Sequence, residues 1–173
     1  RQEEVRWSAP LVQDGVAILV HPENLIDTIS MAELQAIYRG FITNWSEIGG
    51  ENQAITLYSR EDGAGLRLEF NRLVMGQQQT SPNARVLSSS DLMIAQIASD
   101  STGIGYIPIS VLTEQVKTLI IDTVLPSTNT IQDNSYPLRS TIYVIGLEEP
   151  DGNYRQLFSA IQILEENELS GIY

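Results

Sequence analysis

The segment Ser59-Arg60-Glu61-Asp62-Gly63-Ala64-Gly65-Leu66 contains the residue types of a small anion site. It follows a β-type run at residues 55–59 and precedes a helical pattern at residues 67–75. A strand that leads through a glycine-containing turn into a helix points several backbone N–H groups at one place. The positive end of the helix dipole favours negative charge there. Arg60 adds a forked cation suited to oxyanions. The segment therefore predicts that Arg60 and the amides of Gly63, Ala64, Gly65 and Leu66 bind a small oxyanion.

Asp62 narrows the choice of oxyanion. A carboxylate repels a fully ionised anion, but it accepts a hydrogen bond from one that still carries a proton. Hydrogen phosphate carries such a proton near neutral pH and sulfate does not, so Arg60 and Asp62 together would select phosphate. The alternative is an ordinary turn at a helix start, in which Arg60 and Asp62 pair with each other at the surface. Strand-turn-helix segments with glycine are common, and the motif alone leaves both interpretations open.

The composition excludes several other functions. The chain has 173 residues with a net charge of −12, which argues against nucleic acid and anionic membranes as partners. Cysteine is absent, so thiolate catalysis and cysteine-based metal sites are excluded. No apolar run is long enough to span a bilayer, and no signal peptide is seen. We expect a soluble globular domain.

Catalytic or metal chemistry has little support in the sequence. His21 is the only histidine and follows a buried-type strand, so it has no second imidazole for metal and no evident nucleophile to activate. The scattered carboxylates are those of an acidic surface. Ser88-Ser89-Ser90-Asp91 is interpreted as a helix N-cap cluster, with a second anion-binding helix start as the alternative. We therefore expect no catalytic residue, no metal and no cofactor.

The elements that must position this site alternate between strands and helices. Strands are expected at residues 14–21, 55–59, 85–87, 102–108, 116–121 and 138–145. Helices are expected at residues 31–39, 67–76, 92–98, 126–132 and 153–167. Ser30 and Glu33 form a capping box for the first helix, and Gly40 ends it. This alternation predicts an α/β fold with a mixed sheet flanked by helices.

Three finer expectations concern packing. Trp45 and Ile48 are expected to fill the core from a compact connection at residues 42–50. In the helix at residues 92–98, Leu92, Ala95 and either Ile97 or Ala98 are expected to face inward. Ser110 is expected to cap a brief helix.

Several segments together resemble the phosphate-binding protein of bacterial phosphate ABC transporters, a family of class II periplasmic binding proteins. The segments are Asp14-Gly-Val-Ala-Ile-Leu-Val-His-Pro-Glu-Asn24, Ile42-Thr-Asn-Trp-Ser-Glu-Ile-Gly-Gly50, Ser59-Arg-Glu-Asp-Gly-Ala-Gly65, Gly103-Ile-Gly-Tyr-Ile107 and Tyr136-Pro-Leu-Arg139. They occur in the family's order and spacing over almost the whole chain. This collinearity is far more specific than any single segment.

The resemblance implies two α/β lobes that are joined by crossing strands and close on phosphate. Residues 22–137 would form the second lobe, within a single domain of the periplasmic-binding-protein type that spans residues 1–173. Residues 14–21 and 138–173 would supply the crossing strands and a C-terminal helix. The N-terminal part of the first lobe is expected to be absent. We then expect exposed apolar surface on the crossing strands and the C-terminal helix, covered by a homodimer or by segment exchange.

The anion segment departs from the family at two positions. Where the family has Ser-Gly-Thr, this chain has Ala64-Gly65-Leu66, so two hydroxyl donors are missing. A hydrogen bond to a charged partner contributes roughly 1.5–3 kcal/mol, so the loss would be about 3–6 kcal/mol, or roughly two to four orders of magnitude in affinity.

The resemblance implies a non-enzymatic, extracytoplasmic solute-binding component that takes up inorganic phosphate or a similar oxyanion. Its location would be the periplasm or the cell surface as a lipoprotein, with the signal sequence outside this chain. ABC permease subunits would be the partners of the intact protein, and nucleic acid would not be one. The alternative function is a sensory or protein-interaction module that has lost high-affinity phosphate binding.

Overall fold

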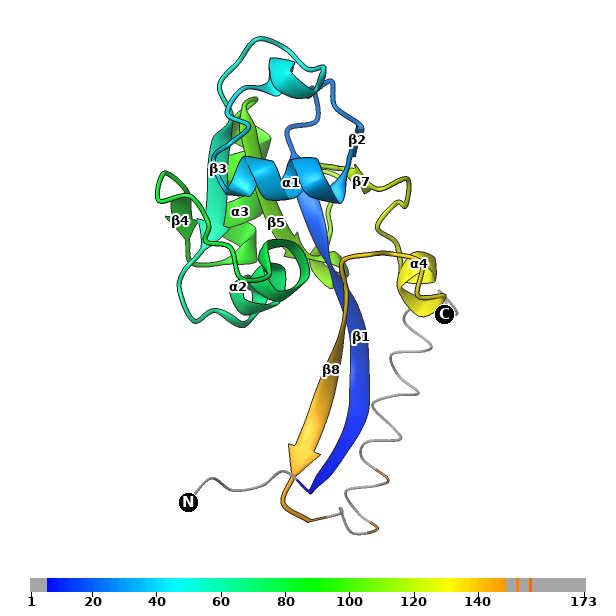
Figure 1. The fold of residues 1–173 in the computed structure, drawn as a ribbon. Helices are drawn as coiled ribbons and strands as arrows, with labels where there is room; N and C mark the ends of the chain where they lie inside the picture. Colours follow the sequence, from blue (N-terminus) through cyan, green and yellow to red (C-terminus); the bar gives the residue numbers. More distant parts are fainter. Residues whose placement is uncertain (1–5, 149–151, 153–155, 157–173) are drawn as a thin grey trace. The chain divides into compact units, whose positions relative to one another are not determined.

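The computed structural model describes residues 6–148, 152 and 156 (Figure 1). Two compact units make up the chain, one formed by residues 1–14 and 140–173 and the other by residues 15–139. The divisions fall within or beside the two strands that the resemblance assigns to the crossing between lobes. All six residues predicted to bind an anion lie in the larger unit.

Strand β1 (Trp7–Val20) contributes to both hydrophobic cores of the larger unit through its residues 16–20, which are all buried. Successive side chains of a strand point to opposite faces of the sheet. Ala17 and Leu19 accordingly join one core cluster, and residues 16, 18 and 20 join the other. Burial on both faces explains the continuous apolar run, as the sequence predicted.

The main sheet of the larger unit has the strand order β4-β3-β5-β1-β6. Strand β3 (Thr56–Arg60) pairs in parallel with β4 (Arg85–Leu87) and with β5 (Gly103–Pro108). Strand β1 pairs antiparallel with β5 and with β6 (Lys117–Thr118). The sheet is therefore mixed, which confirms the predicted fold class. Because β3 has a strand on each side, its C-terminal end holds the anion segment at a fixed position.

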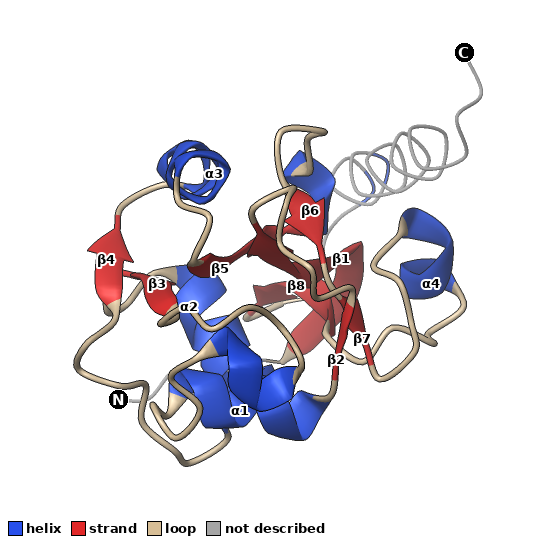
Figure 2. Cartoon of the chain, turned by 90° about the horizontal axis from the view of Figure 1, so that it is seen from above, coloured by secondary structure: helices blue, strands red, loops and turns tan. Residues whose placement is uncertain are grey.

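Helices lie on both faces of this sheet (Figure 2). Helices α1 (Met31–Tyr38) and α2 (Gly65–Phe70) lie on one face, and a π-helical turn, η2 (Asn71–Met75), continues α2. The rings of Phe70 and Tyr106 stack there at 4.1 Å, and Tyr38 packs against both. Helix α3 (Ser90–Ser99) covers the other face through Met93, Ile94 and Ile97.

Short elements complete the larger unit. Strand β2 (Thr28–Ile29) pairs in parallel with β7 (Ile120–Ile121), and α4 (Thr128–Gln132) begins after its N-cap Ser127. Two 3-10 turns are η1 (Trp45–Ile48) and η3 (Ile109–Val111). Trp45 is 2% exposed and Ile48 packs against the core, so the prediction for residues 42–50 is confirmed.

The described part of the smaller unit contains a pair of strands. Strand β8 (Arg139–Gly146) pairs with β1, and the Arg6 N–H donates to the Gly146 carbonyl at 3.0 Å. Large apolar side chains of this unit are exposed, namely Ile142, Tyr143, Ile145 and Leu147. The expected apolar surface is therefore present on β8. The helix predicted at residues 153–167 lies outside the described residues.

Three local predictions were wrong. Leu92 is 50% exposed and Ala95 is also exposed, because α3 turns Met93, Ile94 and Ile97 toward the sheet. Ser110 lies inside η3, whose N-cap is Pro108. The strand expected at residues 116–121 is divided into β6 and β7, because these two strands pair with different partners.

Candidate functional site

The predicted anion segment connects β3 to α2 by a tight turn. The Ala64 N–H donates to the Glu61 carbonyl at 3.2 Å, which closes the turn. Gly63 has a φ of +87°, a left-handed conformation that glycine adopts without the steric cost of a side chain. The sequence correctly placed a strand, a glycine turn and a helix in this order. The amide of Ala64, however, already has a partner in the chain.

The start of α2 has no side-chain cap. Helices α1, α3 and α4 each begin with a serine N-cap whose hydroxyl accepts a backbone N–H, whereas the N-cap of α2 is Ala64, which makes no such bond. The first helical bond of α2 runs from the Leu68 N–H to the Ala64 carbonyl at 3.0 Å. The amides of Gly65 and Leu66 precede it, in the positions that receive no intrahelical partner. These two amides are best placed to meet an anion.

Arg60 is held by its neighbours on two sides. Its Nε and Nη2 donate to the two carboxylate oxygens of Glu61 at 3.1 Å each. The same two nitrogens donate to the carbonyls of Leu87 at 3.0 Å and Ser88 at 2.9 Å. The Arg60 side chain is 13% exposed, and its hydrogen bonds to Glu61 lower the pKa of that carboxyl. An incoming anion would therefore meet a guanidinium that a carboxylate already neutralises in part.

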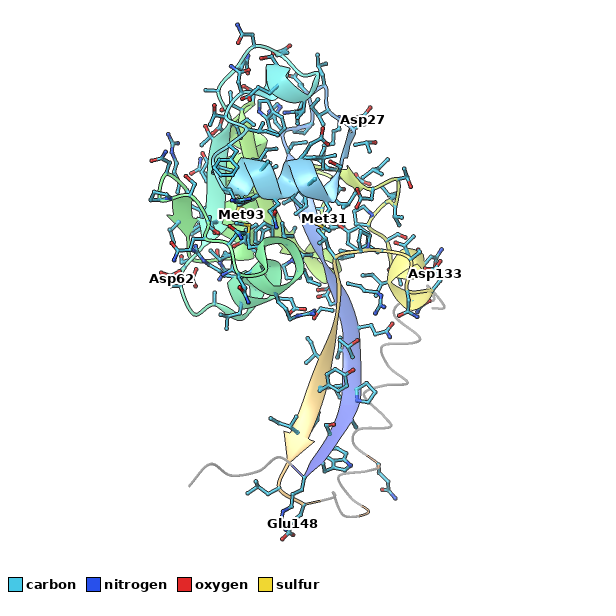
Figure 3. All side chains as sticks on the ribbon, in the orientation of Figure 1. Asp27, Met31, Asp62, Met93, Asp133 and Glu148 are labelled. Carbon is cyan, nitrogen blue, oxygen red and sulfur yellow. The ribbon has the colours of Figure 1, made fainter. Side chains whose placement is uncertain are left out.

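Asp62 points to solvent and pairs with another arginine. Its side chain is 94% exposed, and its Oδ1 lies 3.1 Å from Nη2 of Arg67. Figure 3 labels Asp62 on the loop beside α2. The surface alternative had Arg60 and Asp62 paired with each other, but the structure gives each of them a different partner.

Arg67 is the residue that sequence reasoning missed. It lies in the first turn of α2, and its Nη1 donates to the Ser59 hydroxyl at 2.9 Å and to the Arg60 carbonyl at 2.7 Å. A basic residue is disfavoured at the positive end of a helix. That mismatch was the available signal that Arg67 has partners in the preceding loop.

The loop rests on a buried polar contact with β5. The Ser59 and Tyr106 hydroxyls are 2.9 Å apart, and the Arg60 N–H donates to the Tyr106 hydroxyl at 3.2 Å. Ser59 is 1% exposed and Tyr106 is fully buried. The base of the anion segment is thus fixed, while its turn at residues 61–64 lies nearer the surface.

Leu66 stands where the family's loop has its second hydroxyl donor, and its side chain has a different role. It is partly buried and packs against the core cluster that contains Phe70 and Tyr106. Leu66 therefore offers only its backbone N–H to a ligand. The six predicted residues are Arg60 at the end of β3, Asp62, Gly63 and Ala64 in the turn, and Gly65 and Leu66 at the start of α2. The Arg60 guanidinium contacts Glu61 and the carbonyls of Leu87 and Ser88.

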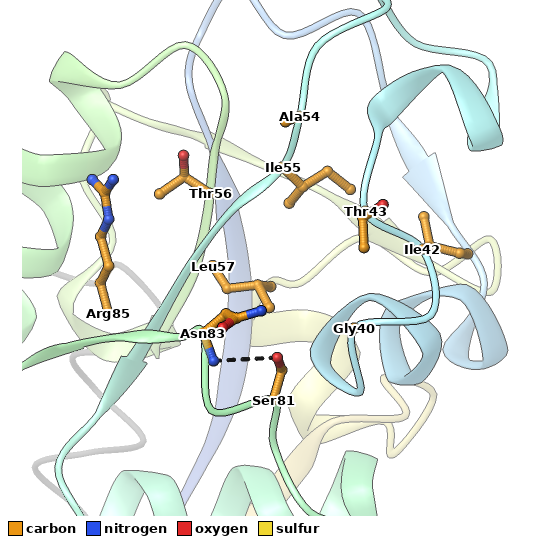
Figure 4. A pocket seen from close by; sticks show the side chains of 10 residues that line it. All are labelled: Gly40, Ile42, Thr43, Ala54, Ile55, Thr56, Leu57, Ser81, Asn83 and Arg85. Carbon is orange, nitrogen blue, oxygen red and sulfur yellow. Dashed lines mark hydrogen bonds between the residues drawn. The ribbon is translucent and has the colours of Figure 1, made fainter.

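The larger unit also has a hollow of about 290 Å³ away from this loop (Figure 4). It is lined by residues of β3, by the segment after α1 and by the loop before β4, and its polar side chains include Thr43, Ser81 and Arg85. None of the six predicted residues lines it. A second hollow of about 200 Å³ has Glu23 and Glu51 in its wall, a charge that disfavours anions.

The described residues show no arrangement for histidine-based catalysis or for metal binding. His21 accepts a hydrogen bond through Nδ1 from the Glu23 N–H at 3.2 Å, which is a local contact at the end of β1. Within the part of the chain that the structure describes, no three histidine, cysteine or acidic side chains gather in a way that would hold a metal. None of the described helices has the length and apolarity needed to cross a membrane.

Comparison with known proteins identifies the class to which this fold belongs. Residues 2–160 match the model of the PBP superfamily domain, and the chain belongs to that superfamily. Within it, the chain is similar to phosphate-binding proteins. It is 35% identical over 126 residues to the phosphate-binding protein PstS of Bacillus subtilis, an alignment that covers 72% of this chain and 41% of the relative. The chain thus spans less than half the length of this curated relative.

Two solved structures agree with this assignment. A crystal structure of an ABC-type phosphate transport receptor from Vibrio cholerae has a TM-score of 0.82 at 25% identity, covering 94% of this chain and 68% of that one. A putative phosphate ABC transporter substrate-binding protein with bound phosphate from Clostridium perfringens has a TM-score of 0.80 at 26% identity, covering 92% and 66%. These relatives are named as binding proteins and receptors, not as enzymes, in agreement with the non-enzymatic module expected from the sequence.

Proposed function

We propose that this chain is the ligand-binding lobe of a solute-binding component for phosphate uptake. The uncapped start of α2, which follows Arg60 after a turn of four residues, is the observation on which the proposal depends. It provides the amides of Gly65 and Leu66 and one guanidinium within a single short loop. Relatives named as phosphate-binding proteins support phosphate as the ligand.

The proposed roles differ between the residues of the loop. Arg60 attracts the anion, and the amides of Gly65 and Leu66 bind its oxygens, with Gly63 and Ala64 shaping the turn. Asp62 accepts a hydrogen bond from the protonated oxygen of hydrogen phosphate through the carboxylate oxygen that does not face Arg67. With Ala64 and Leu66 in place of two hydroxyl donors, the expected phosphate affinity is roughly two to four orders of magnitude below that of a loop that keeps both hydroxyls.

Calorimetry with phosphate, arsenate and sulfate tests the proposal. Phosphate and arsenate should release heat and sulfate should release less, and Arg60→Ala should weaken phosphate binding at least about tenfold, the value of one charge-assisted hydrogen bond. Arg72→Ala is the matched control, because Arg72 is 61% exposed and pairs with Glu69 instead of the loop. Asp62→Asn should reduce the difference between phosphate and sulfate.

Equal heats for the three anions would contradict the selectivity that we assign to Asp62. Phosphate binding that does not change in Arg60→Ala would remove Arg60 from the site. Circular dichroism of each variant should show the wild-type spectrum, so that lost binding is not mistaken for lost folding.

The cellular role that follows is capture of phosphate outside the membrane and delivery to ABC permease subunits. It follows by analogy with the relatives, and an intact protein with both lobes would perform it. The second candidate is a sensory or interaction module, which the replacements at Ala64 and Leu66 favour. A first lobe with serine and threonine phosphate loops in the full-length sequence supports transport, whereas a kinase, anchor or adhesion segment supports the second candidate.

A further inference from the structure

Arg67 occupies a position that is electrostatically unfavourable for a cation. It is the third residue of the continuous helical stretch that α2 and η2 form over residues 65–75, and the first turn of this stretch carries the positive end of the helix dipole. Among the described residues, Arg72 shows the ordinary arrangement for an arginine of the same helical stretch: it is 61% exposed and pairs with Glu69. Arg67 is only 16% exposed, so its position requires compensation by other contacts.

The compensation comes from three separate residues of the preceding loop. The guanidinium of Arg67 reaches the Ser59 hydroxyl at 2.9 Å, the Arg60 carbonyl at 2.7 Å and the Asp62 carboxylate at 3.1 Å. Ser59 and Arg60 end β3, whereas Asp62 belongs to the turn. One planar group therefore connects the strand end, the turn and the first turn of the helix.

These contacts rest on a rigid support. The Ser59 hydroxyl lies 2.9 Å from the Tyr106 hydroxyl, and the Tyr106 ring stacks on Phe70 at 4.1 Å with an interplanar angle of 5°. Tyr106 belongs to β5 and Phe70 ends α2, and both are fully buried. Because Arg67 contacts both this buried support and Asp62, it restricts the motion of the exposed turn relative to the core.

We propose that Arg67 is a positioning residue that fixes the loop of residues 59–66 in one conformation and neutralises Asp62. Without Arg67, the Arg60 carbonyl and the Ser59 hydroxyl lose a charged donor, and the Asp62 carboxylate is released beside the site. The proposal for loop order stands on these contacts alone. Its consequence for phosphate rests on the proposed function.

Amide hydrogen exchange of Arg67→Met, Arg67→Lys and Arg72→Met tests the positioning role. In Arg67→Met we expect exchange to become at least about tenfold faster at the Arg60 and Ala64 amides, which donate to the Tyr106 hydroxyl and the Glu61 carbonyl, because a charge-assisted hydrogen bond is lost. Residues 31–38 of α1 should exchange at the wild-type rate. Arg67→Lys should retain more protection than Arg67→Met, since lysine keeps the positive charge but lacks the forked donors of the guanidinium. Arg72→Met should behave like the wild type.

Two exchange results would overturn the positioning role. One is unchanged exchange at the Arg60 and Ala64 amides in Arg67→Met. The other is an equal acceleration in α1 and in the loop, which would mean that Arg67 contributes only to overall stability. Thermal unfolding of each variant shows whether the fold is retained, and Arg67→Lys carries the test if Arg67→Met does not fold.

Titration with inorganic phosphate separates this inference from the function on which it partly rests. In the wild type, phosphate should shift the amide NMR signals of Gly65 and Leu66, and in Arg67→Met the affinity should be about tenfold weaker. If the wild type binds no phosphate, the proposed function fails while the exchange data still decide the role of Arg67. A loosened loop with unchanged phosphate affinity would contradict the link between loop order and binding.

Discussion

At the scale of single residues, the loop is a balanced set of charges. Arg60 pairs with Glu61 and Arg67 pairs with Asp62, so two cations meet two carboxylates. In a chain with a net charge of −12, this balance leaves little attraction for an anion from a distance. Binding then depends on short-range hydrogen bonds, which are donated from fixed positions.

Removing the negative charge of Glu61 should strengthen anion binding. In Glu61→Gln, Arg60 keeps its contacts to the carbonyls of Leu87 and Ser88 but no longer faces a carboxylate. We expect phosphate affinity to rise about fivefold, as for the loss of one like charge near the ligand in a highly polar medium. Calorimetry at low salt measures the change, and Glu114→Gln, an exposed site elsewhere in the same unit, is the control. Weaker binding in Glu61→Gln would mean that Glu61 orders Arg60 instead of competing for it.

The sequence predicted the strand, the turn and the helix of the candidate anion segment but not the hydrogen bonds of its side chains. Strand, turn and helix are local features, and their signals all lie within residues 56–70. The contacts of Arg60 with Leu87 and Ser88 depend on the pairing of β3 with β4, which brings together residues 27 and 28 positions apart. Local patterns carry no information on such a pairing. The pairing of Asp62 with Arg67 could not be predicted either, because it depends on the conformation of the closed turn.

At the scale of elements, helix starts were easier to predict than helix faces. Ser30 was expected to cap the first helix, and either Ser127 or Thr128 to begin the helix at residues 126–132. The N-caps are Ser30 and Ser127, because a hydroxyl at a helix start satisfies an unpaired N–H wherever it occurs. For α3, four consecutive polar residues at 88–91 made several starts possible. The actual N-cap is Ser89, and Met93 packs over Gly105, where any Cβ would collide with its sulfur. That packing fixes the face of the helix.

The connection between α3 and β5 should depend on pH through Asp100. Its carboxylate accepts bonds from the Tyr58 hydroxyl at 2.8 Å, the Thr102 hydroxyl at 2.7 Å and the Thr102 N–H at 3.0 Å. Burial acts to raise the pKa of Asp100, but these hydrogen bonds outweigh it and the pKa is lowered. Asp100→Asn should therefore reduce the free energy of unfolding by roughly 1.5–3 kcal/mol at pH 7.

The direction of the pH effect follows from the lowered pKa. The folded pKa lies below the unfolded value of about 3.9, so the carboxylate stabilises the fold fully above that pH. This contribution is lost as the pH falls through the folded pKa. Urea unfolding at pH 7, 5 and 3 should show the difference between wild type and Asp100→Asn shrinking only at pH 3. A difference that stays constant down to pH 3 would show that charge on Asp100 contributes nothing.

At the scale of the whole molecule, the fold depends on pairings between distant segments. The main sheet places β1 between β5 and β6, so residues near position 18 pack with residues beyond position 100. Their apolar character was visible in the sequence, and the fold class followed from it. The order of strands was not predicted, since composition and periodicity do not distinguish one order from another.

The exposed apolar residues of β8 should promote self-association. Tyr143, Ile145 and Leu147 alternate along the chain and are 56%, 61% and 48% exposed. Alternate residues of a strand share a face, so Tyr143 and Ile145 lie on one face of β8, and Leu147 follows directly after the strand ends at Gly146. Ile145→Glu should weaken any dimer at least about tenfold, because it places a charge in the contact. Sedimentation equilibrium measures this, with Leu25→Glu, at a leucine that is 66% exposed in the larger unit, as the control. A wild-type chain that stays monomeric at millimolar concentration would contradict the proposal.

The alternation of β1 between two cores also determines where the chain tolerates insertions and deletions. One residue added among positions 16–20 would turn every later side chain of the strand to the opposite layer, exchanging the small Ala17 with bulkier neighbours. The loop at residues 76–79 is exposed and contributes to neither layer, so it can change in length without such an exchange. Length differences among natural homologues should therefore gather in that loop and be missing from the centre of β1.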